Sequence, residues 1–367
     1  MDKGPIEFTD KVVKISSEKD LPEAPISQGF TLANRTGSWR NVRPVLTEQN
    51  APCQNACPLK VWVQSFIELL TLRRPEKAAL EVLKNNPFPL LTRKLCKAKC
   101  EIACNRRKYD APISIRELEG FVGNIGYEKG IFPERGEVLN KKVAVLGNSE
   151  SVMSAAYFSF LYGMDVDLYT TNPFEGLELT KEEIERERKR LLDMGIKIIA
   201  EKASLDELLN DYDAVITDTK EVENKLTFQT DNEKLYVVKP ERRDFSRDLY
   251  FGKRAAKSVY QYLSGEGIQK DPPPPRSVSF NNIVLDYFEP AERTDKINTM
   301  EDAIKEGNRC FSCGHCNSCG NCYVFCPDAA ISWENDLPVI NYDYCKGCGI
   351  CVNECPRNVL VLVPERG

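Results

Sequence analysis

Apolar side chains recur with the period of an α-helix through the first third of the chain. In the segment 60–74 one helical face is apolar throughout. Its positions are Val63, Phe66, Ile67 and Leu70. Further helices are predicted over 75–84 and 113–121, separated by an Asn-Pro-Phe-Pro break. We therefore assign residues 41–137 to an α-helical domain.

From Lys141 onward the pattern changes to short apolar runs that alternate with amphipathic segments. The runs predict strands at 142–147, 165–169, 196–199 and 214–216. Helices are predicted at 151–162, 180–192 and 245–263. The second of these opens with a capping box formed by Thr180 and Glu183. This alternation predicts a parallel sheet with crossover helices, so residues 138–268 are assigned to an α/β domain.

A dinucleotide-binding fold would carry G-x-G-x-x-G directly after the first strand. Gly147 is present, but Ser149 stands where the backbone should approach a pyrophosphate, and Val152 stands where helix and strand should pack closely. Glu150 adds a negative charge beside the expected phosphates, and Thr170 replaces the expected acidic ribose ligand. We predict a degenerate Rossmann-like domain that binds neither FAD nor NAD(P).

Proline-rich segments flank these domains. Residues 1–40 predict an extended arm, in which Trp39 is either a docking anchor or a side chain packed into the chain's own core. Four prolines after Asp271 predict a stiff connector, and residues 269–300 are assigned to a linker.

Composition narrows the functional classes. The net charge of −5 argues against a nucleic-acid partner, and no apolar run is long enough for a membrane span. The chain has a single histidine, which argues against acid–base catalysis by histidine. Clustered cysteines behind an N-terminus without an apolar signal core predict metal binding in the cytoplasm of an organism with anaerobic metabolism. On the helix 245–263, Lys253, Arg254 and Lys257 predict a solvated basic face.

Ten of the fifteen cysteines lie close to the C-terminus, where C-x2-C-x2-C-x3-C-P occurs twice. This spacing is typical of bacterial two-cluster ferredoxins, in which the fourth cysteine of each run ligates the other cluster. The first predicted 4Fe–4S ligand set is Cys316, Cys319, Cys322 and Cys355. The second is Cys345, Cys348, Cys351 and Cys326. We assign residues 301–367 to a two-cluster ferredoxin domain, with zinc binding as the alternative.

Five more cysteines fall within about fifty residues of the helical domain: Cys53, Cys57, Cys96, Cys100 and Cys104. The spacing of four between the last three would place them on one helix face, or around one cluster in irregular chain. Iron–sulfur binding is predicted here too, with buried thiols as the alternative.

The order of these motifs resembles a known iron–sulfur flavoprotein family. A-P-C-x3-C-P, N-P-F-P, C-x3-C-x3-C and P-I-S-I-R-x-L are similar to the N-terminal domain of the glutamate synthase small subunit and of dihydropyrimidine dehydrogenase. The α/β segment is similar to that family's FAD domain, without the NADPH-binding half. The C-terminal block resembles the delta subunits of 2-oxoacid:ferredoxin oxidoreductases, as does T-G-S-W-R-N-V-R-P-V. The resemblance covers about residues 32–364.

The resemblance implies one N-terminal cluster held by Cys57, Cys96, Cys100 and a carboxylate or carboxamide. The last position falls on Glu119, for which a solvated glutamate on a helix face is the alternative.

The family's second N-terminal cluster uses the positions of Cys53 and Cys104 with an upstream C-x2-C pair that this chain lacks. Cys310 and Cys313 form a C-x2-C pair outside the ferredoxin pattern. We hypothesise that they complete this cluster, so that all fifteen cysteines serve four 4Fe–4S clusters.

The sequence therefore predicts a multidomain α+β protein that transfers electrons as a subunit of a larger oxidoreductase complex, rather than a stand-alone enzyme. Catalytic subunits are the predicted partners, first a 2-oxoacid:ferredoxin oxidoreductase, with soluble ferredoxin or a flavoprotein subunit as carrier. Tungsten or molybdenum aldehyde oxidoreductases are the alternative candidates for the partner enzyme. The alternatives are an FAD-containing NAD(P)H:acceptor oxidoreductase subunit and a structural scaffold.

Overall fold

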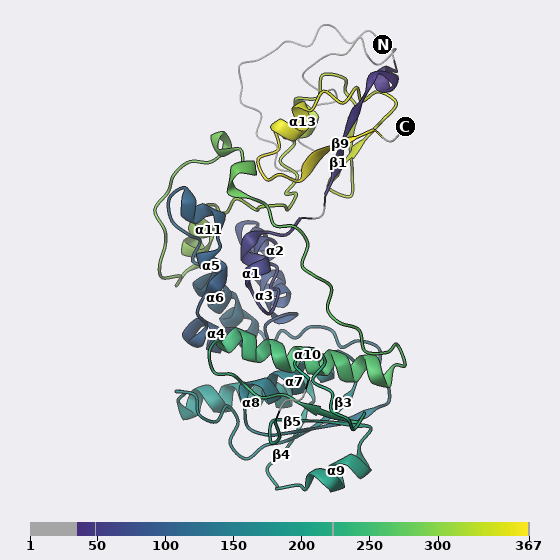
Figure 1. Cartoon of the computed structure of the whole chain (residues 1–367). Coiled ribbons are helices and arrows are strands. Elements are labelled where there is room, and N and C mark those ends of the chain that lie inside the picture. Colours follow the sequence, from purple (N-terminus) through teal and green to yellow (C-terminus); the bar gives the residue numbers. More distant parts are fainter. Residues whose placement is uncertain (1–34, 48, 222–223, 366–367) are drawn as a thin grey trace, which may run out of the picture. The chain divides into compact units, whose positions relative to one another are not determined.

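The computed structural model describes residues 35–47, 49–221 and 224–365, and the chain divides into two compact units (Figure 1). The terminal unit contains the described residues up to Asn50, then Arg276–Glu289 and the chain from Phe311 onward. The central unit contains Ala51–Pro275 and Pro290–Cys310. The predicted arm at 1–40 lies largely outside the described residues.

The first part of the central unit is helical, as predicted. Its helices are α1 (Pro52–Ala56), α2 (Val63–Thr71), α3 (Pro75–Leu83), α4 (Pro89–Leu95), α5 (Lys99–Ile102) and α6 (Ile115–Glu128). Helices α1, α3 and α4 each begin with proline. Proline has no N–H group, and this costs nothing here because N–H groups in the first turn have no acceptor within the helix. The apolar face of α2 is buried against α3, and α6 runs seven residues beyond the predicted end at residue 121.

The connector also contributes a helix to the central unit. Helix α11 (Met300–Gly307) begins with a capping box from Thr299 and packs on α2. A Cβ at Gly307 would lie 2.9 Å from Thr71 and 3.3 Å from Ile67, so the two helices approach closely here. This helix, predicted at the start of the ferredoxin domain, thus belongs to the central unit.

The second part of the central unit is a five-stranded parallel sheet in the order β4-β3-β2-β5-β6. Its strands are β2 (Lys142–Leu146), β3 (Asp165–Tyr169), β4 (Lys197–Ile199), β5 (Ala214–Thr217) and β6 (Leu235–Val237). Its helices are α7 (Glu150–Leu161), α8 (Lys181–Met194), α9 (Leu205–Asp211) and α10 (Phe245–Leu263). The predicted capping box of Thr180 and Glu183 is present. Strand β6 was not predicted.

Helices cover both faces of this sheet. On one face, Leu208 of α9 packs with Ala144 of β2 and Val215 of β5. Side chains alternate between the two faces along a strand, so the residues next to Ala144 and Val215 face α7 on the opposite side. Helix α7 is buried on nearly every side because α10 runs alongside it (Figure 1). A Cβ at Gly252 of α10 would lie 2.0 Å from the carbonyl oxygen of Ser151, so only glycine permits this approach.

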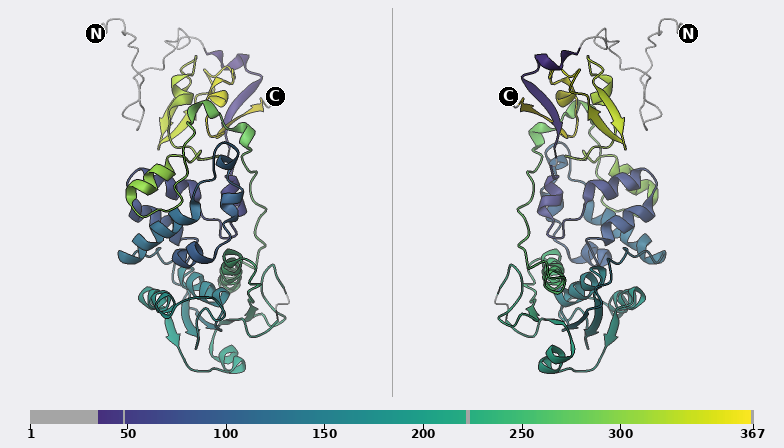
Figure 2. Two further views of the ribbon diagram at one scale, coloured as in Figure 1. Left: turned by 90° about the vertical axis from the view of Figure 1, so that its left-hand side faces the viewer. Right: turned by 90° about the vertical axis from the view of Figure 1, so that its right-hand side faces the viewer.

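The terminal unit joins distant parts of the sequence. Strand β1 (Val42–Leu46) pairs antiparallel with β9 (Leu360–Pro364), as both views of Figure 2 show. Strands β7 (Ile331–Glu334) and β8 (Leu337–Ile340) form a hairpin, and α12 (Asn321–Val324) and α13 (Ile350–Asn353) are single turns. Residues 42–46, predicted within the helical domain, are therefore a strand of the terminal unit. Trp39 is 63% exposed, which excludes its packing into a core of the described chain.

Among the described residues, no helix combines the length and apolar character needed to cross a membrane.

Candidate iron–sulfur sites and the crevice of the sheet

Two cavities of the terminal unit are lined by the two predicted cysteine sets. The first holds Cys316, Cys319, Cys322 and Cys355 around about 360 Å³ of empty space, part of it open to solvent. The second holds Cys326, Cys345, Cys348 and Cys351 around about 320 Å³. Each set thus combines three cysteines of one run with the fourth of the other.

Glycines let the chain turn around each cavity. Gly320 and Gly349 have φ of 84° and 81° and cap the single-turn helices that carry Cys322 and Cys351. Because the same Cys-Gly-x-Cys segment occurs in both runs, the two loops adopt the same local conformation. Backbone N–H groups also reach the sulfurs: Ala330 donates to Cys326 Sγ at 3.3 Å. Such N–H donors stabilise ligand thiolates and tune a cluster.

The donor chemistry fits a cationic cluster core. Burial, together with the charges of the nearby Cys326 and Cys345, raises the pKa of Cys351 to about 12. Burial also raises the pKa of Cys322 well above its ordinary value, reinforced by Cys319 and Cys316. Thiolates are the metal ligands, so these sites need positive charge from iron to hold their thiols ionised.

The residues of the predicted N-terminal set come from four separate elements. Cys57 follows α1, Cys96 follows α4, Cys100 lies on the single turn α5, and Glu119 lies on α6. The spacing of four left two arrangements open: one helix face, or irregular chain around one cluster. Because α4 ends at Leu95 and α5 is only a single turn, Cys96, Cys100 and Cys104 do not lie on one continuous helix. The left-handed Ala98 (φ 49°) turns the chain there, and its N–H donates to Cys96 Sγ at 3.4 Å.

These four side chains are close enough to act on one another electrostatically. The pKa of Cys57 is raised to about 12 by burial and by the charge of Glu119. That of Cys100 is raised by burial, Cys57 and Glu119. Burial raises the pKa of Glu119 to about 7, although a hydrogen bond from Asn86 Nδ2 (2.8 Å) to Glu119 Oε1 opposes this. Glu119 is therefore a partly buried side chain whose carboxylate accepts a hydrogen bond from Asn86.

The remaining cysteines are divided between the units. Cys53, Cys104 and Cys310 belong to the central unit and Cys313 to the terminal unit. Cys53 is buried and acts electrostatically on Cys100. Burial raises the pKa of the Cys104 thiol, while backbone hydrogen bonds from Ile113, Arg106 and Arg107 lower it.

A buried ion network fixes the chain beside Cys104 and Cys310. The Arg309 guanidinium donates to Glu306 (2.6 Å), to Asp110 (3.0 Å) and to the carbonyl oxygen of Ala111 (2.7 Å). Arg106 pairs with Asp110 and donates to the Arg309 carbonyl oxygen at 2.9 Å. Both arginines are almost fully buried. Sequence reasoning missed this network, although Arg309 directly precedes a cysteine and Arg106 follows one by two residues.

The predicted basic face on α10 is wrong for two of its three residues. Lys253 donates to Asn85 Oδ1 at 2.7 Å and to the Leu59 carbonyl oxygen at 3.3 Å, and Arg254 is 2% exposed. Lys257 reaches the surface and pairs with Asp271 at 2.8 Å. Lys253 is partly buried against the helical part, whereas Arg254 donates to Ser258 of α10 and to the Gln269 carbonyl oxygen beyond it. The charge pattern alone could not reveal these contacts.

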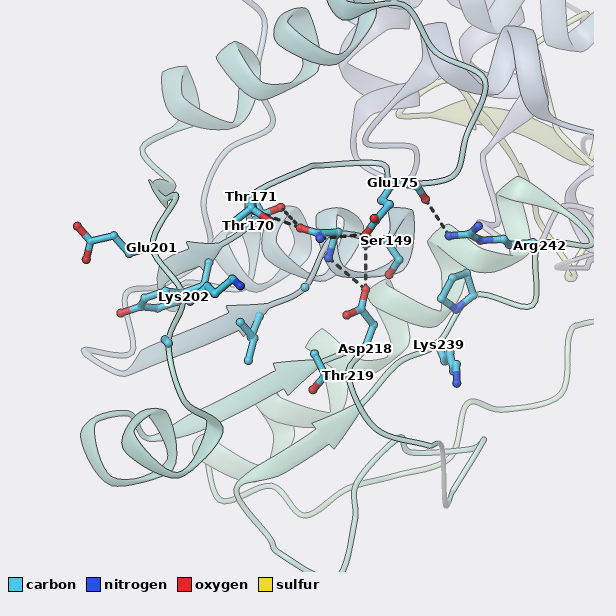
Figure 3. Close-up of a pocket in the computed structure, with 16 residues that line it drawn as sticks. Ser149, Thr170, Thr171, Glu175, Glu201, Lys202, Asp218, Thr219, Lys239 and Arg242 are labelled. Carbon is cyan, nitrogen blue, oxygen red and sulfur yellow. Dashed lines mark hydrogen bonds between the residues drawn. The ribbon is translucent and has the colours of Figure 1, made fainter.

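A large crevice lies where the parallel strands end. It has about 1180 Å³ of empty space, open on one side, at the carboxyl ends of β2, β3, β4, β5 and β6 (Figure 3). Gly147 and Ser149 line it, together with Asp218 after β5. This is the edge at which doubly wound sheets bind ligands.

Comparisons with known proteins match the cysteine-bearing parts. Residues 42–131 match the family "dihydropyrimidine dehydrogenase domain II, 4Fe-4S cluster", and residues 315–359 match the "4Fe-4S dicluster domain". The predicted resemblance is thus confirmed, and the chain carries 4Fe–4S domains of both kinds.

Similar proteins include the NADH glutamate synthase of Schizosaccharomyces pombe, 26% identical over 50% of this chain and 10% of that protein. The pyruvate synthase subunit PorD of Methanocaldococcus jannaschii is 57% identical over 17% of this chain and 66% of its own length. The dihydropyrimidine dehydrogenase subunit PreT of Salmonella typhimurium is 26% identical over 46% of this chain and 45% of its own length. The chain therefore spans less than two thirds of each.

Proposed function

We propose that this chain is an iron–sulfur subunit that carries electrons within a larger oxidoreductase complex. The observation that carries the proposal is the pair of cavities, each lined by four thiols in the crossed ferredoxin arrangement. When bound, 4Fe–4S clusters supply one-electron transfer without bond chemistry by the protein. The chain's residues hold the clusters, bury them and donate backbone N–H groups to the sulfurs.

The first partner candidate is a 2-oxoacid:ferredoxin oxidoreductase. Support comes from the 57% identity to a subunit named as part of pyruvate synthase, over 63 residues. The central unit would then be an additional electron path attached to a delta-type ferredoxin. Its α/β part is a degenerate dinucleotide-binding domain in this proposal, supported by the parallel strand order with β2 in the centre.

We further propose the ligand sets. Two clusters use the cysteines of the two cavities, and a third uses Cys57, Cys96, Cys100 and Glu119, supported by their mutual electrostatic effects. A fourth uses Cys53, Cys104, Cys310 and Cys313. This set is proposed because these are the four cysteines that remain after the other three sets are assigned. The Arg309–Arg106 hydrogen bond supports a fixed position of Cys310 near the chain that carries Cys104.

Iron analysis of the anaerobically purified chain tests the ligand sets. Four clusters predict about sixteen irons per chain, and the ferredoxin pair alone predicts about eight. Cys310→Ser is expected to remove about four irons, whereas Cys316→Ser is the positive control for loss of a ferredoxin cluster. Unchanged iron in Cys310→Ser would exclude this cysteine as a ligand.

Co-purification from the native organism tests the complex. Catalytic subunits of a thiamine-dependent 2-oxoacid oxidoreductase are expected to elute with the chain. If the chain is recovered with an aldehyde oxidoreductase instead, that enzyme replaces the 2-oxoacid oxidoreductase as the proposed partner. Recovery as a stable monomer carrying flavin would contradict the proposed function and favour the flavoenzyme alternative.

A further inference from the structure

The N-terminus of α7 presents backbone donors to the crevice. The loop Gly147–Ser149 leads into this twelve-residue helix, and the first N–H groups of a helix have no partner within it. In dinucleotide-binding sheets, such groups hold a pyrophosphate. Here the N–H groups of the loop residue Asn148 and of the N-cap Ser149 hold a side chain: Asp218 Oδ2 accepts from Asn148 N at 3.2 Å and from Ser149 N at 2.9 Å (Figure 3).

Asp218 also fills the space that Gly147 leaves. Gly147 has φ of 145°, and a Cβ built on it would lie 2.1 Å from Asp218 Oδ1. The glycine that would let a phosphate approach the backbone therefore lets this carboxylate approach instead. A phosphate oxygen and Asp218 cannot occupy the same donors together.

A second side chain occupies the neighbouring position at the end of β3. Asn148 Oδ1 accepts from the Thr170 hydroxyl at 2.8 Å and from the N–H groups of Thr171 and Asn172 at 3.2 and 3.1 Å. Thr170 is where a ribose ligand would be expected, and its hydroxyl is already bonded. The side chains of this chain thus take over contacts that a nucleotide would make.

The crevice as a whole is lined by charges of both signs, with Lys202, Lys239 and Arg242 beside Glu175, Glu201 and Asp218. Glu150 is buried at the first position of α7, and its Oε2 has no hydrogen-bond partner among the described residues. Glu150 does not line the crevice, whereas Asp218 does. A phosphate that approached the N–H groups of Asn148 and Ser149 would meet the Asp218 carboxylate already bound there.

We propose that Asp218 is an internal anion that takes the phosphate position of the crevice and thereby excludes dinucleotides from the α/β domain. The residues present do not fit FAD, which the related family would imply. The carboxylate supplies the negative charge that the helix N-terminus favours, so the domain folds around α7 without a nucleotide. This proposal does not depend on which complex the subunit serves.

The test is anion binding by the full chain, purified anaerobically, with inorganic pyrophosphate and ADP as probes. Asp218→Ala frees the two N–H groups, so it should melt at a lower temperature than the wild type. Pyrophosphate should then raise its melting temperature, whereas the wild type should not respond. Equilibrium dialysis should give saturable pyrophosphate binding for Asp218→Ala and none for the wild type.

Asp213→Ala is the matched control. Asp213 lies at the other end of the same strand, and its Oδ2 accepts from Lys142 N at 2.9 Å. Its loss should destabilise the sheet without creating an anion response. Asp218→Asn keeps the size and one acceptor oxygen, so it should melt close to the wild type and bind pyrophosphate more weakly than Asp218→Ala.

Two outcomes would overturn the proposal. One is saturable binding of pyrophosphate or ADP by the wild type, or flavin released from it on denaturation. The other is a folded Asp218→Ala or Asp218→Asn variant whose response to pyrophosphate equals that of the wild type. The flavin measurement needs no variant, so the proposal stays testable even if both substitutions prevent folding.

Discussion

At the residue scale, single buried charges set the electrostatics of the N-terminal cysteine site. Burial lowers the pKa of Lys253 to about 8, and the charge of Cys57 opposes this shift. The ammonium is therefore still the major form at pH 7. It lies on α10, so the α/β part supplies a positive charge to a site built by the helical part.

We expect Lys253→Met to lower the reduction potential of the N-terminal cluster. A unit charge several ångströms away contributes on the order of 1–2 kcal/mol at an effective dielectric of about 20, which corresponds to tens of millivolts. An EPR-monitored redox titration measures the shift. Lys257→Met is the control, because that ammonium pairs with Asp271 near the surface. Equal shifts in both variants would contradict the assignment.

Glu119 gives a second prediction at this scale. Glu119→Ala should lose the N-terminal cluster or change its EPR spectrum, and Glu119→Cys should restore cluster content with a sulfur ligand. Glu117→Ala is matched to it, since Glu117 lies on the same helix but pairs with Arg93 at 2.7 Å. If Glu119→Ala keeps the wild-type iron content and spectrum, the carboxylate is not a ligand.

At the scale of elements, α6 and α8 meet through a buried acid. Glu187 of α8 is fully buried, and its Oε2 accepts from the Tyr127 hydroxyl of α6 at 2.5 Å. Burial raises the pKa of Glu187 from 4.5 to about 7, although Tyr127, Arg186 and Arg190 oppose the shift. The contact between the two helices is therefore sensitive to protonation.

Glu187→Gln should stabilise the protein above neutral pH. The folded chain binds more protons than the unfolded chain between pH 4.5 and about 7, so the wild type loses stability as pH rises through this window. Glutamine mimics the neutral acid and should gain on the order of 2–3 kcal/mol at pH 8, but little at pH 4.5. Unfolding at the two pH values measures this. Glu185→Gln, 64% exposed in its side chain, should show no such pH dependence.

At the scale of the whole molecule, segments near both ends of the described chain build one unit. Strand β1 pairs with β9, and the Arg40 guanidinium donates to both carboxylate oxygens of Glu365 at 2.7 and 2.9 Å. It also donates to the carbonyl oxygens of Tyr342 and Cys345. Arg40 thus ties β1 to the loop that begins the second cysteine run.

Arg40→Ala should speed the loss of the ferredoxin clusters. Breaking the bidentate pair and the carbonyl contacts should lower the local stability around the start of the second cysteine run. The decay of visible absorbance in the presence of an iron chelator measures the rate. Arg35→Ala is the control, because its contact with Asp343 spans 3.9 Å between exposed side chains and should contribute little. Equal decay rates would show that β1 does not protect the clusters.

Much of the fold could be predicted because its signals are local. The bounds of α10 and β3 agree with the predicted ranges, since an amphipathic repeat and an apolar run specify them without distant partners. Strand β6 was missed because its three residues follow a polar segment and are strands only by pairing with β5. The placement of β1 and α11 was missed for the same reason, since each packs on a segment remote in sequence.

The sequence by itself determined that two parts of this chain are of 4Fe–4S type. Cysteine spacing predicts which thiols surround one cluster, because two-residue gaps leave the chain little freedom, and the thiols of each predicted set line one cavity. Only the tertiary structure decided where charge is buried. Lys253 lies beside the cysteine site and Asp218 accepts from the N–H groups that lead into α7 because helices and strands far apart in sequence converge there. Such contacts depend on packing, which residue spacing does not encode.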